Sequence, residues 1–258
     1  MDERVLQSRG NSFASVADSY DAGRPGYPIA SVGWLVGERP VRVVDLAAGT
    51  GLFSEALVAA GHRVLALEPS EQLAARLLQR LPAAWTARAS AERLPLARRC
   101  AEAVTVAQAF HWFDAGAALD EIARVLRPGG ALGLVWNFRD TSVPWVARLS
   151  ALLRADGKLE ESTAEQFAAR VDGSGLFTPV ERRSFRLWQP VDRDQLLDLV
   201  RSRSYVATLD AADRRQLLDR VGQLYDDAAA STSALMLPYV TRCFRTRLRR
   251  VPRPPEAS

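Results

Sequence analysis

The stretch that decides the fold is Val43-Val44-Asp45-Leu46-Ala47-Ala48-Gly49-Thr50-Gly51-Leu52-Phe53-Ser54. An apolar run reaches an acidic residue, small residues and glycines follow, and a helix-like pattern then resumes. This order is typical of a strand that ends in a tight turn, where bare backbone can lie against a nucleotide. The stretch therefore predicts a nucleotide-like cofactor held on a parallel sheet.

Outward from this turn, short apolar runs alternate with longer amphipathic ones. We expect strands at Val41–Leu46, Arg63–Leu67, Ala84–Arg88, Ala103–Ala107 and Ala131–Trp136, with helices between them at Leu52–Ala60, Ser70–Arg80 and Ala117–Leu126. Gly61 ends the first helix, and Arg127-Pro128-Gly129-Gly130 ends the third. Strand and helix alternating at this spacing imply right-handed crossovers, and hence a parallel sheet with helices on both faces.

After Asn137 the rhythm changes. Further helices are expected at Trp145–Leu153, Ala164–Val171, Arg193–Arg201 and Ala211–Tyr225. A strand at Val180–Trp188 alternates like an antiparallel edge strand, and Pro238 suggests an edge position for a last strand at Leu235–Arg247. No repeat or linker divides the sequence, so we expect one domain over residues 1–250, with an N-terminal cap (1–40), a cofactor-binding core (41–140) and a substrate cover with the last strands (141–250), followed by a disordered tail (251–258).

The composition argues against several other kinds of protein. The 258 residues are 48% hydrophobic and 25% charged, which is ordinary for a globular protein. No apolar run could span a bilayer and the polar start leads into no signal-peptide stretch, so we expect a cytoplasmic protein without a membrane partner. The excess of positive charge gathers in the Arg-rich last stretch without interleaved aromatic residues, so no nucleic-acid partner is expected. Cys100, Cys243, His62 and His111 lack the spacing of metal ligands, so no metal site is expected.

Two residues narrow the choice of cofactor. Glu68 ends the second strand, where a carboxylate accepts hydrogen bonds from both ribose hydroxyls. The alternative for Glu68 is local, because a carboxylate just before Pro69-Ser70 can also serve the start of the next helix. Ser54 stands where dinucleotide sites carry their third glycine. This disfavours NAD or FAD and fits a nucleoside cofactor without phosphates.

Several separate segments carry a more specific signal. They are Phe13–Pro28, the turn Asp45–Gly51, Leu67–Ser70, Ala89–Leu96, Ala107–Asp114 and Arg124–Gly130. Together, in this order, they resemble the class I S-adenosylmethionine (SAM)-dependent methyltransferases, in particular the trans-aconitate-methyltransferase-like (type 11) subgroup. The resemblance covers about the first 140 residues. It implies an α/β, Rossmann-like fold with a seven-stranded, mostly parallel sheet, an antiparallel last strand and a helical cover.

The resemblance also implies roles for particular residues. The methionine part of SAM would lie against Asp45, Ala47, Gly49 and Gly51, the ribose on Glu68, the adenine on Ser90 and Ala91, and the sulfonium region beside Gln108, while Tyr20 and Arg24 would close over the cofactor. The alternative for Tyr20 is simple packing of an N-terminal helix. Ala47 replaces the first glycine of the family turn, and because alanine suits ordinary φ angles we expect a tighter turn that still binds. Ser90 stands where many relatives carry an acid, and its oxygen can accept the same bond from the adenine amine.

The activity implied is methyl transfer from SAM to a small organic acceptor, at a carboxylate or hydroxyl oxygen, by direct displacement. S-adenosylhomocysteine is the product. His111 is either a base that takes a proton from the acceptor or a residue that shapes the pocket. The alternatives are an N- or C-methyltransferase of a natural-product scaffold, a SAM-binding protein that does not methylate, and an NAD-dependent dehydrogenase on a similar sheet.

Overall fold

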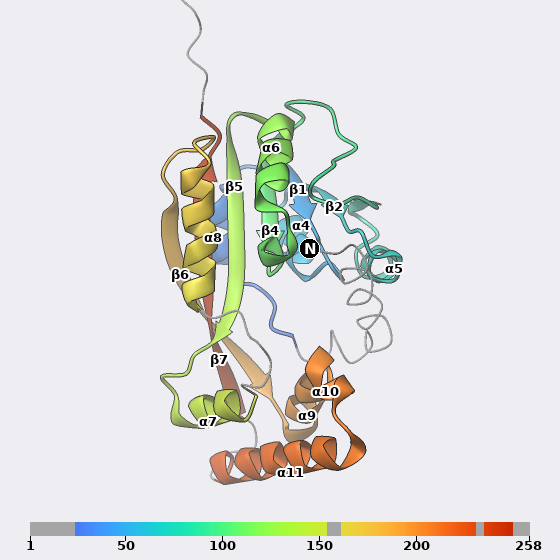
Figure 1. The fold of residues 1–258 in the computed structure, drawn as a ribbon, viewed down its shortest axis with the longest axis vertical. Helices are drawn as coiled ribbons and strands as arrows, with labels where there is room; N and C mark the ends of the chain where they lie inside the picture. The colour runs from blue at the N-terminus through green and yellow to red at the C-terminus, as the bar shows by residue number, and fades with distance from the viewer. Residues whose placement is uncertain (1–23, 154–160, 231–234, 250–258) are drawn as a thin grey trace, which may run out of the picture. The chain divides into compact units, whose positions relative to one another are not determined.

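The computed structural model describes residues 24–153, 161–230 and 235–249 (Figure 1). The chain divides into two compact units. The core unit comprises Tyr27–Trp136, Glu160–Phe185 and Arg242–Ser258, and the helical unit comprises Met1–Gly26, Asn137–Leu159 and Arg186–Thr241. Each unit is described by itself below. The predicted division into cap, core and cover stays a prediction, and the predicted disordered tail lies outside the described residues.

A seven-stranded sheet has the order β3-β2-β1-β4-β5-β7-β6. Its strands are β1 (Arg42–Leu46), β2 (Arg63–Leu67), β3 (Trp85–Ala87), β4 (Ala101–Ala107), β5 (Leu126–Arg139), β6 (Glu181–Val191) and β7 (Leu235–Arg247). The strands β1 to β5 pair in parallel. Backbone bonds between Gly129 or Gly130 and Leu248, and between Asp140 and Pro238, show that β7 runs antiparallel to β5. The predicted fold class, a mostly parallel sheet with an antiparallel last strand, is confirmed.

Two expectations about the later strands are wrong. β7 lies between β5 and β6, so Pro238 does not mark an edge strand. Pro238 is tolerated there because its carbonyl accepts the bond from Asp140 N at 2.9 Å, a bond that needs no N–H from proline. β5 begins at Leu126, five residues earlier than Ala131. The turn residues join the strand because Gly129 takes a positive φ of 82° and the register against β4 shifts beside it.

Helices cover both faces of the sheet in the core unit (Figure 1). On one face lie α3 (Ile29–Val36), α4 (Leu52–Ala59) and α5 (Glu71–Arg80); the other carries α6 (Ala115–Val125) and α8 (Glu161–Gly173). The helices begin at side chains that satisfy their free N–H groups: Ser70 Oγ accepts from Leu73 N, and Asp114 Oδ1 accepts from Gly116 N and Ala117 N. Val32, Leu35, Phe53, Leu57 and Leu77 of the first group join Val43, Ala66, Ala103 and Val135 of the strands in one buried apolar cluster.

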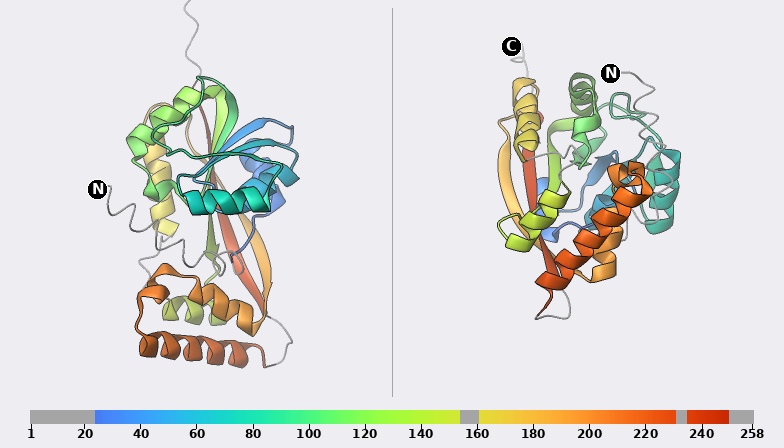
Figure 2. Two further views of the ribbon diagram at one scale, coloured as in Figure 1. Left: turned by 90° about the vertical axis from the view of Figure 1, so that its right-hand side faces the viewer. Right: turned by 60° about the horizontal axis from the view of Figure 1, so that its bottom comes forward.

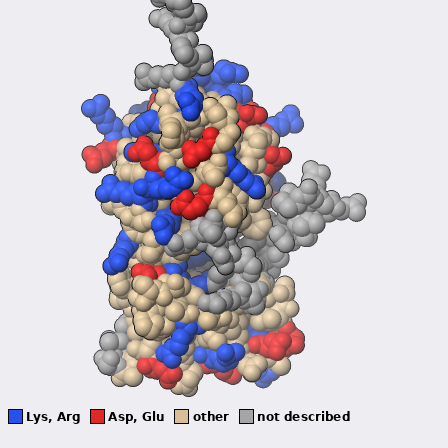
Figure 3. Space-filling model, turned by 60° about the vertical axis from the view of Figure 1, so that its left-hand side comes forward, with Lys and Arg blue, Asp and Glu red and all other residues tan. Residues whose placement is uncertain are grey.

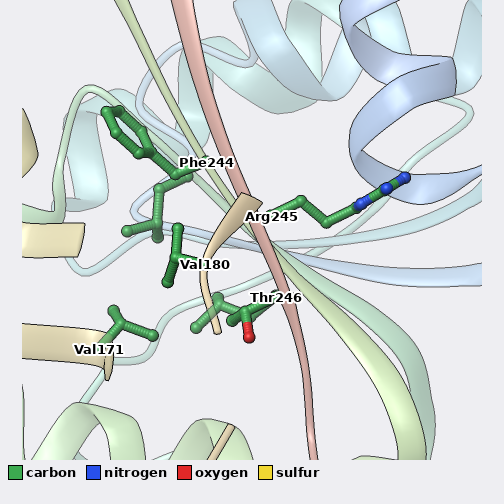
Figure 4. Close-up of a pocket in the computed structure, with 7 residues that line it drawn as sticks. Val171, Val180, Phe244, Arg245 and Thr246 are labelled. Atoms are coloured by element: carbon green, nitrogen blue, oxygen red, sulfur yellow. The ribbon is translucent and has the colours of Figure 1, made fainter. Parts of the chain in front are cut away.

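Helix α8 packs over β5 and β7 and leaves one narrow gap (Figure 4). The gap is lined mostly by apolar side chains, among them Val171, Val180 and Phe244, and is too small to hold a water molecule. Phe167 of α8 stacks on Trp136 of β5 with ring centroids 6.1 Å apart, which holds this face of the sheet closed. The gap is therefore part of the apolar core and offers no room to a ligand.

The helical unit has a second apolar core. It is built from α7 (Pro144–Leu152), α9 (Arg193–Arg201), α10 (Ser204–Thr208) and α11 (Ala211–Ala228), with α11 packed on both α7 and α9 (Figure 2). A capping box between Asp192 and Gln195 opens α9. Val146, Leu149, Leu196, Val200, Val221 and Leu237 are buried in this core. None of the helices in the described part of the chain is long and apolar enough to cross a bilayer.

Charged side chains of both signs are interspersed on the face shown in Figure 3. Several form ion pairs: Glu102, for example, binds Arg42 at 3.0 Å and Arg127 at 2.5 Å. These two arginines lower the pKa of Glu102 to about 2, mainly through the hydrogen bonds from Arg42. The arginine-rich composition is thus partly balanced on the surface, and the expected absence of a nucleic-acid partner stays a prediction.

Candidate functional site

The predicted site lies where parallel strands of the core unit end. The carboxyl ends of β1, β2 and β4 meet at one edge of the sheet, the edge at which open α/β sheets bind ligands. The chain leaves β1 through a turn with three left-handed residues: Ala47 has φ 51°, Gly49 φ 62° and Gly51 φ 90°. The expectation that Ala47 has an ordinary φ is therefore wrong. The turn requires a left-handed residue there, which glycine would adopt without strain and alanine adopts at a cost of about 1 kcal/mol.

The two glycines of this turn have different surroundings. A methyl group added at Gly49 would meet no atom within 4 Å, so the turn presents bare backbone to open space. A methyl group at Gly51 would lie 3.0 Å from Leu77 Cγ, so this glycine lets α4 start close against α5. Gly49 is therefore suited to receive a ligand, and Gly51 to bring the two helices together.

Glu68 joins the turn to the end of β2. Its side chain is buried, and its Oε2 accepts a hydrogen bond from Gly49 N at 2.8 Å while its Oε1 accepts one from Ser70 N at 2.9 Å. Burial raises the pKa of Glu68, and the two backbone bonds oppose that rise. The local role at the start of the next helix is thus present. Because each carboxylate oxygen can accept a second bond, this role is compatible with binding a ribose.

Asp45 lies deeper than the turn itself. It is fully buried, and its two carboxylate oxygens accept hydrogen bonds from Ser54 Oγ at 2.6 Å and Thr105 Oγ1 at 2.8 Å. Burial raises the pKa of Asp45 to about 6 against these two bonds. The carboxylate therefore anchors the end of β1 to α4 and β4. Asp45 would therefore act on the methionine part of SAM indirectly, by fixing the position of the turn.

Sequence reasoning missed the partners of Asp45. Ser54 was interpreted only as the place of an absent glycine, and Thr105 carried no motif. Thr105 stands directly opposite Asp45 in the β1–β4 register, so only the pairing of the two strands could have revealed it. Ser54 follows Asp45 by nine residues, across the turn and into the first turns of α4.

The remaining cofactor-binding candidates follow β3 and β4. Ser90 is exposed and its carbonyl accepts a bond from Arg93 N at 3.3 Å, whereas Ala91 is buried. Gln108 follows β4 directly, with φ 59° and its N–H bonded to Val135 O at 2.9 Å. The left-handed backbone at Gln108 turns the chain away from β4 at the same sheet edge as the glycine turn. These placements are consistent with the adenine and sulfonium roles, which stay predictions.

His111 lies in a short 3-10 helix, η1 (Phe110–Trp112), after Gln108. Its ring lies against Trp112, with centroids 4.6 Å apart, and near Phe167 at 6.3 Å. Its Nδ1 is buried and has no hydrogen-bond partner among the residues that the structure describes. Burial lowers the pKa of His111 to about 4, so the imidazole is neutral at pH 7.

The roles of the two N-terminal candidates stay predictions. Arg24 belongs to the helical unit, and Tyr20 lies outside the described residues. Within the described residues no group of three or more His, Cys, Asp or Glu side chains could hold a metal ion. The structure thus brings the glycine turn and Glu68 into direct contact, with Ser90, Ala91, Gln108 and His111 on loops of the same unit.

Comparison with known proteins agrees with this geometry. Residues 44–134 match the family model of a methyltransferase domain. An uncharacterized methyltransferase of Mycobacterium tuberculosis is 41% identical over 239 residues, which cover 92% of this chain and 96% of the relative. A malonyl-[acyl-carrier protein] O-methyltransferase of Methylococcus capsulatus is 37% identical over 134 residues, 48% of this chain and 49% of the relative. A solved structure assigned to a type II methyltransferase of Anaeromyxobacter dehalogenans has a TM-score of 0.62 at 26% identity, covering 88% of this chain and 97% of that one.

The family model covers the chain from the end of β1 to β5, and the match to the Mycobacterium tuberculosis relative runs through both units. All of these matches are methyltransferases, which excludes the dehydrogenase alternative. They do not distinguish the trans-aconitate-methyltransferase-like subgroup from other subgroups. The chain belongs to the class I methyltransferase family.

Proposed function

We propose that this protein transfers a methyl group from SAM to an oxygen atom of a small organic acceptor. The observation that carries the donor assignment is the contact between Glu68 and the glycine turn. A buried carboxylate, held by two backbone amides, stands beside a backbone face that is open at Gly49. A nucleoside with adjacent hydroxyls and no phosphates fits this arrangement, because the carboxylate accepts from hydroxyls and the turn offers no further glycine for a pyrophosphate.

The residues present fit the parts of SAM in turn. Glu68 would accept hydrogen bonds from the ribose hydroxyls, Gly49 and Gly51 would leave room for the methionine part, and the loop at Ser90 and Ala91 would hold the adenine. Gln108 would lie beside the sulfonium. Bound SAM supplies a methyl group on positively charged sulfur, which makes it an activated donor for in-line displacement. The task of the chain is then to position donor and acceptor and to exclude water.

Two observations support an oxygen acceptor. The partial relative from Methylococcus capsulatus is named as an O-methyltransferase of a malonyl group, and its likeness covers 48% of this chain. In addition, His111 has a pKa of about 4, which makes its neutral ring a weak proton acceptor. A carboxylate acceptor needs no base, since it is already ionised and has no proton to lose when its oxygen attacks the methyl group. We therefore assign His111 to shaping the pocket, and a carboxylate is the favoured acceptor.

The donor is tested by thermal unfolding and calorimetric titration with S-adenosylhomocysteine, with NAD as the matched comparison. Stabilisation by S-adenosylhomocysteine alone is expected, because a ligand that binds only the folded protein raises its unfolding temperature. Stabilisation by NAD alone would overturn the donor assignment.

The reaction is tested with methyl-labelled SAM and a panel of carboxylic acids, alcohols, amines and activated carbon acids. Transfer to carboxylic acids is expected to be fastest. Transfer only to nitrogen or carbon would contradict the acceptor assignment, and binding without transfer to any member of the panel would support a role as a SAM-binding protein.

A further inference from the structure

The loop that leaves β3, residues 88–100, follows α6 along the length of the helix. Near the start of the helix, Glu92 Oε1 accepts a hydrogen bond from Asp114 N at 3.1 Å, and Asp114 is the residue that caps α6. In the last turn of the helix, Arg99 N donates to Arg124 O at 3.0 Å. The loop is therefore attached to α6 at both ends of the helix.

Two side chains of α6 hold the backbone of this loop at one position. Leu94 N donates to Glu121 Oε2 at 2.8 Å, and Leu94 O accepts from Arg124 Nη2 at 3.0 Å. The other terminal nitrogen of Arg124 donates to Leu96 O at 2.7 Å. Because Leu94 is buried, its backbone groups depend on such partners within the protein. Glu121 and Arg124 therefore fix the peptide groups on both sides of Leu94.

Glu121 and Arg124 also hold each other. Arg124 Nε donates to Glu121 Oε1 at 2.5 Å, and Arg124 Nη2 donates to Glu121 Oε2 at 2.8 Å. Two parallel bonds of this kind fix the relative orientation of a guanidinium and a carboxylate. The hydrogen bonds from Arg124 lower the pKa of Glu121 to about 2, so this carboxylate is ionised at neutral pH. The two side chains are therefore held in one arrangement, in which both face the loop.

The fixed position lies directly after the predicted adenine contacts. Ser90 pairs with Arg93 in an isolated antiparallel bridge, and Leu94 is the next residue. The beginning of the segment is fixed as well, because Glu68 N donates to Ala87 O at 3.1 Å. The short turn of the bridge is thus held at one end by the strand that carries Glu68 and at the other end by α6.

We propose that Glu121 and Arg124 are positioning residues for the cofactor, which hold the loop after β3 in the conformation that binds the adenine of SAM. This inference rests on the proposed function, from which it takes the adenine contacts. Each of the two residues acts through the backbone of Leu94. A loop that is already held in its bound conformation loses less conformational freedom when the ligand binds, so the affinity is higher.

The test compares Arg124→Gln with the wild type by calorimetric titration with S-adenosylhomocysteine, at a temperature at which both are folded. A loop that populates its binding conformation about a tenth of the time binds about tenfold more weakly, and a loss of this order is expected. Hydrogen exchange should become faster at Leu94 and its neighbours in the loop, and should stay unchanged at Gly49. Arg124→Lys keeps a positive charge opposite Glu121 but lacks the second branch for a second carbonyl, so it should recover only part of the affinity.

Arg182→Gln is the matched control. Arg182 Nε pairs with Glu165 at 2.8 Å and Arg182 Nη1 donates to Val180 O at 2.8 Å, so this arginine also joins a carboxylate to a backbone carbonyl. It lies on β6, the edge strand opposite β3 in the order of the sheet, and its loss should leave the affinity unchanged.

Four outcomes would overturn the inference while leaving the proposed function intact. They are wild-type affinity in folded Arg124→Gln, equal weakening by Arg182→Gln, full affinity in Arg124→Lys, and exchange that rises at Gly49 as much as at Leu94. Arg124→Lys retains the charge pair and so remains informative should Arg124→Gln fail to fold. A wild-type protein that binds no S-adenosylhomocysteine would instead overturn the proposed function, and this inference with it.

Discussion

Removal of the Glu68 carboxylate should affect both the fold and the cofactor. In Glu68→Ala the amides of Gly49 and Ser70 lose their acceptor, and an unsatisfied buried donor costs about 1–3 kcal/mol. Burial of the carboxylate is unfavourable for its charged form and raises the pKa of Glu68. Removing the carboxylate removes this unfavourable burial, which offsets part of the cost. We therefore expect the free energy of unfolding to fall by about 2–3 kcal/mol.

The affinity for S-adenosylhomocysteine should fall further than the stability alone would require. Two hydrogen bonds from ribose hydroxyls to a charged carboxylate contribute about 3 kcal/mol together, which corresponds to a loss of about 100-fold in affinity. Urea unfolding gives the first quantity and calorimetric titration of the folded variant gives the second. Glu68→Gln retains one acceptor oxygen and should lie between the wild type and Glu68→Ala in both.

The matched control is Glu71→Ala, three residues along the chain. Glu71 begins α5, its side chain is 77% exposed, and it pairs with Arg88 at 3.1 Å on the surface. Exposed pairs contribute about 0–1 kcal/mol, so this variant should retain its stability and affinity. A folded Glu68→Ala protein that binds S-adenosylhomocysteine as tightly as the control would refute the ribose assignment. Stability equal to that of the control would refute the backbone role.

Three further predictions concern the turn and His111. Gly51→Ala should lower the free energy of unfolding by about 1 kcal/mol more than Gly61→Ala, because both have a positive φ but only Gly51 would push a methyl group against Leu77; equal losses in urea would show that packing is not involved. Ala47→Gly should stabilise the protein by about 0.5 kcal/mol and Ala47→Val destabilise it by about 2 kcal/mol, since φ is 51°; a more stable valine variant would contradict the left-handed turn. The pKa of His111 is about 4, below its ordinary value of 6.5. Between these two pH values the folded protein binds fewer protons than the unfolded chain, so the free energy of unfolding falls as the pH falls through this range. His111→Phe should remove up to about 3 kcal/mol of that loss, and unfolding curves at pH 7 and pH 4.5 that shift equally in both proteins would disprove it.

Local signals in the sequence predicted most element boundaries. Some bounds depend on interactions between residues that are near neighbours in the chain. Examples are the start of α5 at Ser70, the end of α4 before a glycine, and the apolar runs of β2 and β7; these bounds were predicted within one residue. The contact of Glu68 with the turn also follows from local order, since both elements end parallel strands that pair directly. Such signals describe interactions between residues that lie close together in the sequence.

The misses share a different origin. The bonds of Asp45 to Thr105 depend on strand register, and the position of Pro238 depends on which strands flank β7. The left-handed φ of Ala47 is imposed by the turn against the intrinsic preference of alanine. In each case tertiary pairing decides a property that the residue type alone does not carry, which is why propensity and motif could not reveal it.

The boundary between the two units cuts through single strands. β5 passes from one unit to the other between Trp136 and Asn137, and β7 does so between Thr241 and Arg242. Neither unit therefore corresponds to a continuous stretch of gene, and no truncation at either end can release one of them intact. A fragment ending at Trp136 would keep the complete glycine turn and Glu68 yet lose β6 and β7, leaving β5 as an exposed edge prone to aggregation. Insertions and fusions should instead be placed in connections that stay within one unit.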